Sequence, residues 1–171
     1  MKNLVLFFSL LLLAALGCQS DLLTTADDSV DLRAKKMVPF HSETIQWLDP
    51  ESLPADCGFP ADFLFEGYAT HLGMVTGWLH GYHCEFAGPV FTGYLHGAYV
   101  AANGDELWFD GVVSVNFASN PPALISDGTT FTGGTGRWAN ATGSATGQMF
   151  PTETPGVDLY IFDGEVSAPG K

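Results

Sequence analysis

The amino-acid sequence predicts an all-β fold, an eight-stranded antiparallel β-barrel, and two observations support that prediction. From residue 63 onward, glycine, Asn-Gly and Pro-Pro recur about every ten residues, which is the spacing of short strands joined by turns. Beyond the N-terminal apolar run, no stretch shows the apolar period of an amphipathic helix. Closing such a series of strands into a barrel removes their exposed edges.

The composition indicates one packed domain of acidic character. The chain has 171 residues, of which 46% are apolar and 15% charged, the opposite of the balance in a disordered chain. Its net charge is -13, and only Arg137 and Lys171 carry positive charge after residue 57. This excludes binding to nucleic acid through phosphate contacts and favours neutral or cationic partners.

The first 17 residues are typical of a secretory signal peptide. Lys2 provides the charged start, and the apolar run over 4–13 is too short to remain as a membrane-spanning helix. The segment Ala15-Leu16-Gly17-Cys18 resembles the lipobox of bacterial lipoproteins, although Ala15 and Leu16 exchange their usual roles.

The lipobox resemblance implies that acylated Cys18 anchors the protein to a lipid membrane. Gln19 differs from the Asp of an inner-membrane retention signal, so we expect an exported outer-membrane lipoprotein facing the periplasm or the cell surface. An ordinary cleaved signal peptide with an unmodified Cys18 is the alternative.

The other two of the three cysteines, Cys57 and Cys84, form a pair that can close a disulfide in an oxidising compartment. A loop of this size would be stabilised by about 3 kcal/mol. The alternative makes Cys84 a metal ligand beside His80 and His83. Because residues three apart on a strand point to opposite faces, we predict neither a metal site nor a cofactor.

Residues 18–36 lack glycine and aromatic side chains and are predicted to be a flexible tether, whereas 37–171 form the barrel domain. Prolines at 50, 54 and 60 exclude a helix after the first strand. The predicted strands are 38–47, 63–72, 74–86, 90–101, 106–117, 123–132, 138–150 and 157–167.

The clearest local signals lie in the middle of the domain. Asn103-Gly104 is the preferred pair of a tight hairpin turn and predicts positive backbone angles there. The strand that follows alternates between an apolar face, starting with Leu107 and Phe109, and a mostly polar face.

A hexapeptide, Thr76-Gly77-Trp78-Leu79-His80-Gly81, is echoed sixteen residues later by Thr92-Gly93-Tyr94-Leu95-His96-Gly97. On neighbouring strands, the glycines of each copy share one face, and the aromatic and histidine side chains share the other. The glycine face would form either a small-residue layer filling a narrow barrel or one side of a ligand cleft.

The segment over 131–147, Phe131-Thr132-Gly133-Gly134-Thr135-Gly136-Arg137-Trp138 and onward, resembles the glycine-rich segment of allene oxide cyclase-like barrels and plant dirigent proteins. Ala69-Thr70-His71-Leu72-Gly73 is similar to a segment of their small bacterial exported relatives. The resemblance covers about residues 37–168 and implies an eight-stranded antiparallel barrel of lipocalin-like shape. It carries over no catalytic residue.

The glycines around Thr135 also have a structural explanation, a turn and bulge that redirect the chain into a strand beginning near Trp138. Three residues remain as candidates for ligand binding, namely His80, His96 and Arg137. A structural ion pair near the turn is the alternative role of Arg137.

The sequence therefore favours a membrane-anchored, non-enzymatic barrel that binds a small apolar, amphipathic or cationic ligand or serves as an envelope interaction module. An isomerase or cyclase acting inside the barrel and a purely structural surface lipoprotein are the alternatives. A hollow interior would separate ligand binding from the structural role. His80 or His96 inside a cavity beside a carboxylate would favour an enzyme, whereas both on the outer surface would remove the enzyme from contention.

Overall fold

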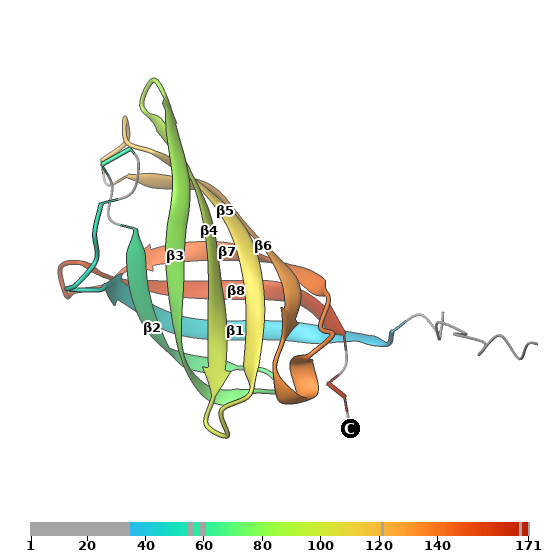
Figure 1. Ribbon diagram of the computed structural model, residues 1–171. Helices are drawn as coiled ribbons and strands as arrows, with labels where there is room; N and C mark the ends of the chain where they lie inside the picture. The colour runs from blue at the N-terminus through green and yellow to red at the C-terminus, as the bar shows by residue number, and fades with distance from the viewer. Residues whose placement is uncertain (1–34, 55–56, 59–60, 121, 168, 171) are drawn as a thin grey trace, which may run out of the picture. The chain divides into compact units, whose positions relative to one another are not determined.

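The computed structural model shows a closed barrel of eight antiparallel strands, which confirms the predicted fold class (Figure 1). It describes residues 35–54, 57–58, 61–120, 122–167 and 169–170. The expectations for the signal peptide, Cys18 and the tether up to residue 34 fall outside the described residues. Within the described part of the chain, no helix has the length and apolar character needed to cross a membrane.

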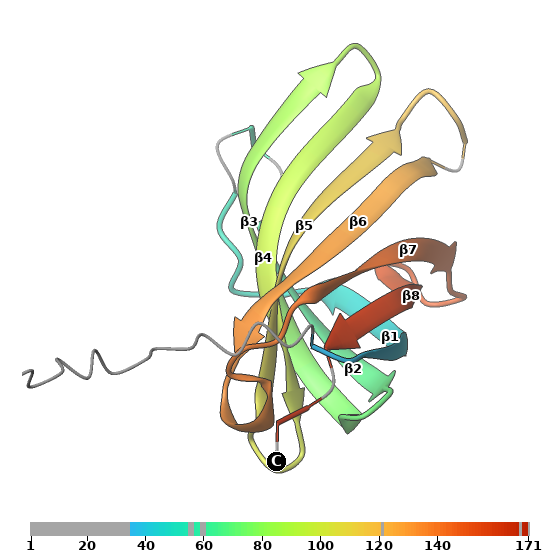
Figure 2. The same cartoon turned by 90° about the vertical axis from the view of Figure 1, so that its right-hand side faces the viewer.

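The strands follow one another around the barrel in sequence order, and β1 closes it by pairing with both β2 and β8. Their bounds are β1 Met37–Leu48, β2 Asp62–Ala69, β3 Gly73–Ala87, β4 Val90–Ala101, β5 Glu106–Asn116, β6 Ala123–Gly134, β7 Gly143–Pro151 and β8 Val157–Ser167. β3 is the longest, and its hairpin with β4 projects at one end of the barrel (Figure 2).

The Asn-Gly pair forms the β4–β5 hairpin as predicted, but only its glycine has a positive φ. Gly104 has φ 84°, whereas the φ of Asn103 is not positive. Instead, Asn103 Oδ1 accepts a hydrogen bond of 3.1 Å from the backbone N–H of Asp105. The backbone N–H of Ala101 donates to the carbonyl of Asp105 at 2.9 Å and closes the turn.

Side chains alternate between the inside and the outside of the barrel, as the sequence predicts for β5. Leu107 and Phe109 point inward and are 0% and 6% exposed, whereas Trp108 between them is 42% exposed on the outside. The same two-residue period, interrupted by bulges in β3 and β6, directs about half of the side chains to the interior. Along the barrel axis, these side chains fill the interior to different extents.

One half of the interior is a packed core, here termed the closed half. Its rings interlock with edge-on geometry, the centroids of Phe40 and Phe131 lying 4.7 Å apart. Trp138, on the single-turn 3-10 helix η1 (Gly136–Trp138), covers this end and is only 1% exposed. The core consists of Phe40, Phe65, Ala69, Leu72, Val75, Tyr99, Ala101, Leu107, Phe109, Phe131, Trp138, Ala141, Ala145 and Val166.

The repeated hexapeptide places its glycines inside the barrel, and their roles divide by depth. A Cβ atom on Gly77 would overlap the ring of Phe65, and one on Gly97 would lie 2.6 Å from Cζ of Phe109. These two glycines therefore make room for rings of the closed half. Gly81, by contrast, lines the open interior described below.

The glycine-rich segment ends β6 with a bulge and a turn, as predicted, but no strand begins near Trp138. Thr132 is the extra residue, because Trp108 pairs with Gly133 and Phe109 with Phe131. The chain then enters η1, and β7 begins only at Gly143. Gly136 has φ 51°, and a Cβ atom there would also overlap the carboxyl group of Asp105. The turn thus needs glycine for its shape and its packing.

The predicted disulfide between Cys57 and Cys84 is present, with Cα atoms 5.8 Å apart. It joins the connection between β1 and β2 to the inner face of β3, where Cys84 is 8% exposed. The interpretation of Cys84 as a metal ligand is therefore wrong.

Candidate functional site

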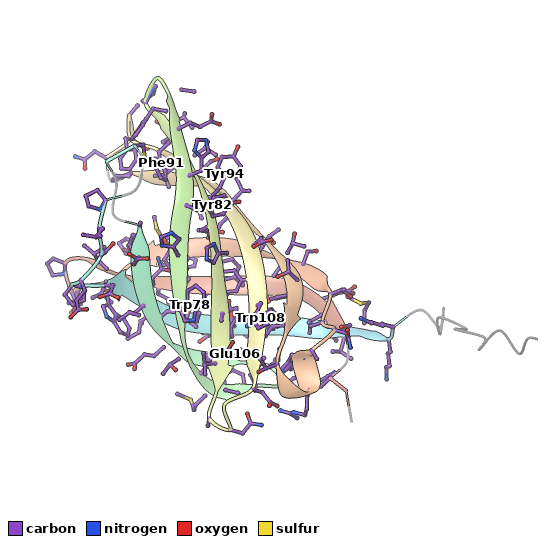
Figure 3. All side chains as sticks on the ribbon, viewed as in Figure 1. Trp78, Tyr82, Phe91, Tyr94, Glu106 and Trp108 are labelled. Atoms are coloured by element: carbon purple, nitrogen blue, oxygen red, sulfur yellow. A yellow bond between two sulfur atoms is a disulfide. The ribbon has the colours of Figure 1, made fainter. Side chains whose placement is uncertain are left out.

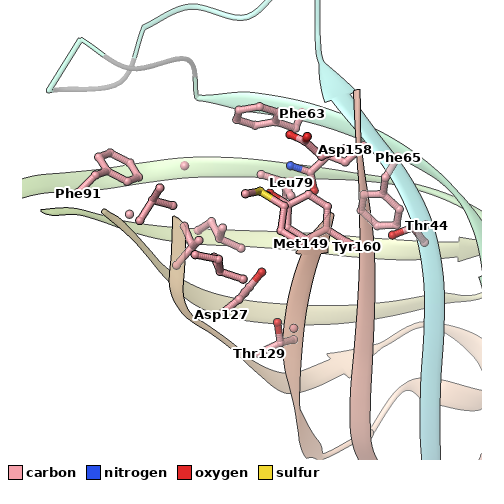
Figure 4. A pocket seen from close by; sticks show the side chains of 18 of the residues that line it. Thr44, Phe63, Phe65, Leu79, Phe91, Asp127, Thr129, Met149, Asp158 and Tyr160 are labelled. Carbon is pink, nitrogen blue, oxygen red and sulfur yellow. The ribbon is translucent and has the colours of Figure 1, made fainter. Parts of the chain in front are cut away.

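A cavity of about 800 Å³ occupies the other half of the barrel, here termed the open half (Figure 4). This volume lies within the range of about 300–1,000 Å³ that is typical of small-molecule sites. All eight strands contribute to its wall, through residues that include Thr44, Phe63, Leu79, Leu95, Val113, Asp127, Met149 and Tyr160.

The floor of the cavity is a triangle of aromatic rings that also belongs to the core. The ring centroids of Phe65 and Tyr99 are 5.0 Å apart, and those of Tyr99 and Phe109 are 5.4 Å apart. Above this floor the strands diverge, and Gly81 and Gly93 place no side chain into the interior. Aromatic and aliphatic side chains therefore line a space that they do not fill.

One carboxyl group stands out in this apolar space. Asp127 of β6 is 8% exposed and lines the cavity. A Cβ atom added to Gly147 would lie 2.9 Å from Oδ2 of Asp127. The glycine at position 147 therefore makes room for the carboxyl group. Burial raises the pKa of Asp127 to about 7, because transfer out of water disfavours the ionised form.

Two tyrosine hydroxyl groups lie near the same interior. Tyr160 of β8 donates its hydroxyl proton to Sδ of Met149 at 3.2 Å, and Tyr99 shares a hydrogen bond of 3.2 Å with Ser42 across the barrel. Burial raises the pKa of both tyrosines, and the negative charge of Asp127 adds to the effect. Both phenols therefore remain neutral at physiological pH.

A second, less buried carboxyl group also lines the cavity. Asp158 of β8 pairs across the strands with Gln46 of β1, and both line the wall. Partial burial raises the pKa of Asp158. The cavity thus combines an apolar wall with two carboxyl groups, of which Asp127 is the more buried.

No protein-family model, curated protein or solved structure matches this chain.

The predicted candidates His80 and His96 lie together on the outside of β3 and β4, away from the cavity lining. Their ring centroids are 5.3 Å apart. Nδ1 of His80 lies 2.6 Å from Oδ1 of Asp62, and this contact lowers the pKa of the carboxyl group. Neither histidine can contact a molecule held inside the barrel, so His80 and His96 give no support to an enzyme acting in the interior.

These histidines belong to an exposed aromatic surface (Figure 3). Trp78 and Trp108 flank Ala98, which also points outward yet is 0% exposed because the two indoles cover it. Nε1 of Trp108 donates to Oε2 of Glu106 at 2.6 Å and fixes one ring.

The expectation that His80 and His83 point to opposite faces is wrong. The register shifts between Gly81 and His83, so one extra residue enters β3 and reverses the alternation beyond it. His83 consequently stacks on Tyr94 at the exposed rim, with ring centroids 5.5 Å apart. Even so, across the described residues no group of three or more His, Cys, Asp or Glu side chains is arranged to hold a metal ion.

Arg137, the third predicted candidate, lies at the closed end. Its Nε donates to Oδ2 of Asp105 at 3.2 Å, and the structure thus supports the ion-pair role near the turn rather than ligand binding.

The sequence did not single out Asp127 or Tyr160 as site residues. A bulge in β6 shifts the register between Ser114 and Val115, but it lies before Asp127, and the two-residue period from Phe131 through Thr129 reaches Asp127 on the inner face. On β8, Asp158, Tyr160 and Phe162 follow the two-residue period. That period was an available signal, although polar and apolar residues mix on both faces of this strand.

Proposed function

We propose that this protein binds a small apolar or amphipathic molecule in the open half of its barrel. The observation that carries the proposal is the cavity of about 800 Å³, which opens at one end and has few polar groups. Apolar surface that a ligand buries there leaves water, and this supplies the driving force for binding. Only the closed half of the barrel is filled by its own side chains, as a purely structural role would require of the whole barrel.

Cavity-filling substitution gives a direct test of this proposal. A Cβ atom on Gly81 would meet nothing closer than 3.5 Å, and the position points inward, so Gly81→Leu should fill space without distorting the strand. Gly128 lies exposed on the outside, where an added Cβ atom would meet nothing within 4 Å, and Gly128→Leu is the matched control.

Native mass spectrometry of protein isolated from its own cell envelope supplies the measurement. We expect a bound small molecule on the wild-type protein and on Gly128→Leu, and its loss from Gly81→Leu. A bare protein mass in all three samples, repeated across growth conditions, would count against ligand binding.

Asp127 favours a second candidate function, an isomerase or cyclase acting inside the barrel. A carboxyl group that exchanges its proton near neutral pH beside the neutral phenol of Tyr160 has the properties of an acid–base group. Incubating the eluted ligand with fresh protein tests this. Conversion to an isomer by the wild type but not by Asp127→Asn would establish it, whereas unchanged ligand would leave binding alone.

We also propose that the protein is an exported lipoprotein anchored through Cys18. The lipobox-like residues before Cys18 and the disulfide between Cys57 and Cys84 support export to an oxidising compartment. In a Gram-negative host, labelled palmitate should enter the wild-type protein but not Cys18→Ser. Gln19→Asp should keep the label and shift the protein to the inner membrane. Equal labelling of Cys18→Ser would refute acylation at this residue.

The resemblance of the segment over 131–147 to allene oxide cyclase-like and dirigent barrels remains part of this proposal rather than its basis. It is compatible with a small molecule held in a barrel interior. The cavity supports that conclusion independently of the resemblance.

A further inference from the structure

We propose that the ligand of the cavity is an apolar molecule with one basic amine, and that the carboxylate of Asp127 binds this amine as an ion pair. The inference rests on the proposed function, since it assigns a chemical class to the ligand of the same site. Three features of the molecule support it: the charges around the cavity, the position of Asp127 and the nature of the wall.

Charge is distributed unevenly along the barrel axis. The described lysines and arginines all lie at the closed end: Lys35 donates to the carbonyl of Asn140, Lys36 directly precedes β1, and Arg137 pairs with Asp105. The described lining of the cavity includes no lysine or arginine. An entering molecule therefore meets a negative potential and no fixed positive charge.

The position of Asp127 makes it an unneutralised acid deep in an apolar site. Among the described residues, no basic side chain forms an ion pair with it, and its Oδ2 atom lies beside Gly147, which offers no polar side chain. A buried carboxylate without a partner is costly, and an ammonium group from a ligand would supply the missing partner. The described lining of the barrel offers no such group of its own.

The wall suits the remainder of such a molecule. Tyr160 and Phe162 lie with nearly parallel rings, 12° between planes and 6.3 Å between centroids, and both line the cavity beside Asp127. Ring faces attract cations, and the surrounding aliphatic side chains accommodate hydrocarbon. A carboxylic acid ligand, by contrast, would place its negative charge in a site that already holds Asp127 and Asp158.

Three probes that differ in one group can test the assignment with the full-length protein: 1-adamantylamine, 1-adamantanol and 1-adamantanecarboxylate. Their apolar cage is identical, so differences in affinity report the polar group alone. At about pH 8 we expect the amine to bind about tenfold tighter than the alcohol and the carboxylate to bind most weakly. Calorimetric titration measures all three.

The isosteric variant Asp127→Asn should leave the affinity for the alcohol unchanged. It should lower the affinity for the amine to the same value. Asp110→Asn, the same substitution on the exposed outside of β5, should preserve the preference for the amine. A preference for the carboxylate, or an amine-to-alcohol ratio that survives in Asp127→Asn, would overturn the assignment.

The pH dependence of the wild-type protein gives a second test that needs no variant. Tyr160 and Asp158 of β8 and Tyr99 of β4 share the interior with Asp127, and His83 lies at the rim. Both phenols stay neutral throughout, so lowering the pH below about 7 protonates Asp127 in the interior. Affinity for the amine should then fall while affinity for the alcohol stays constant, and equal pH responses would contradict the ion pair.

Failure of the proposed function gives a different result from failure of this inference. If none of the three probes shows binding that Gly81→Leu weakens, the cavity does not bind small apolar molecules at all. If they bind there with similar affinities, the cavity binds apolar molecules, and only the assignment of an amine is wrong.

Discussion

Neutralising Asp127 should stabilise the folded protein, and by an amount that depends on pH. The carboxyl group has a pKa of about 7 when folded, against an ordinary value of 3.8. Each unit of pKa difference corresponds to about 1.4 kcal/mol, so the ionised carboxylate costs the folded state about 4 kcal/mol above pH 7. Asp127→Asn keeps the shape of the side chain and removes the charge.

The direction follows from proton binding. Between pH 3.8 and about 7 the folded protein holds a proton on Asp127 that the unfolded chain has lost, so stability falls as the pH rises through this window. Urea unfolding of the wild type and Asp127→Asn should give similar free energies at about pH 4 and values about 4 kcal/mol apart at about pH 8, with the variant more stable.

Asp110→Asn, whose side chain is exposed on the outside, serves as the control and should stay within about 0.5 kcal/mol of the wild type at both pH values. A gap between the wild type and Asp127→Asn that is the same at both pH values would show that the carboxyl group is not held in a poorly solvated site. The reasoning about the ligand would lose its electrostatic basis at the same time.

Four further variants test the packing and the disulfide. Gly147→Ala would bring a methyl group to 2.6 Å from the ring of Phe162, so it should cost about 1–3 kcal/mol of stability by thermal melting and displace the carboxyl group beside it. Removing the disulfide by Cys57→Ala with Cys84→Ala should lower the free energy of unfolding by about 3 kcal/mol, measured against the oxidised protein. Trp138→Ala should cost about 3–5 kcal/mol. Trp138→Phe should cost much less, because Nε1 has no hydrogen-bond partner among the described residues and its removal leaves no polar group unpaired.

The barrel itself could be predicted because its signals are local. Gly104 shapes the hairpin between β4 and β5, and the alternation that begins with Leu107 and Phe109 assigns the inner face of β5 without knowledge of its neighbours. The two cysteines left after Cys18 needed only an oxidising compartment to suggest their pairing. Each of these inferences depends on a few adjacent residues or on simple counting.

The site could not be predicted, because it depends on register and on volume. One extra residue between Gly81 and His83 reverses the faces of the strand beyond it. In β6 the alternation places Asp127 inward with Thr129 and Phe131, but it does not show that a cavity lies beside it. Whether the space beside an inward-facing glycine is filled by a ring or left open also depends on which neighbours face that glycine. The ring of Phe65 fills the space beside Gly77, whereas Gly81 faces the cavity, although both glycines lie on the inner face of the same strand.

The unequal filling of the barrel separates the residues that hold the fold from those that would recognise a ligand. Substituting Val113 or Met149 in the open half leaves the interlocked rings around Phe40 and Phe131 untouched. The strands should therefore exchange their amide hydrogens slowly near that core and faster toward the mouth, even within one strand. A lineage carrying this architecture can change what it binds through single substitutions, at little risk to folding.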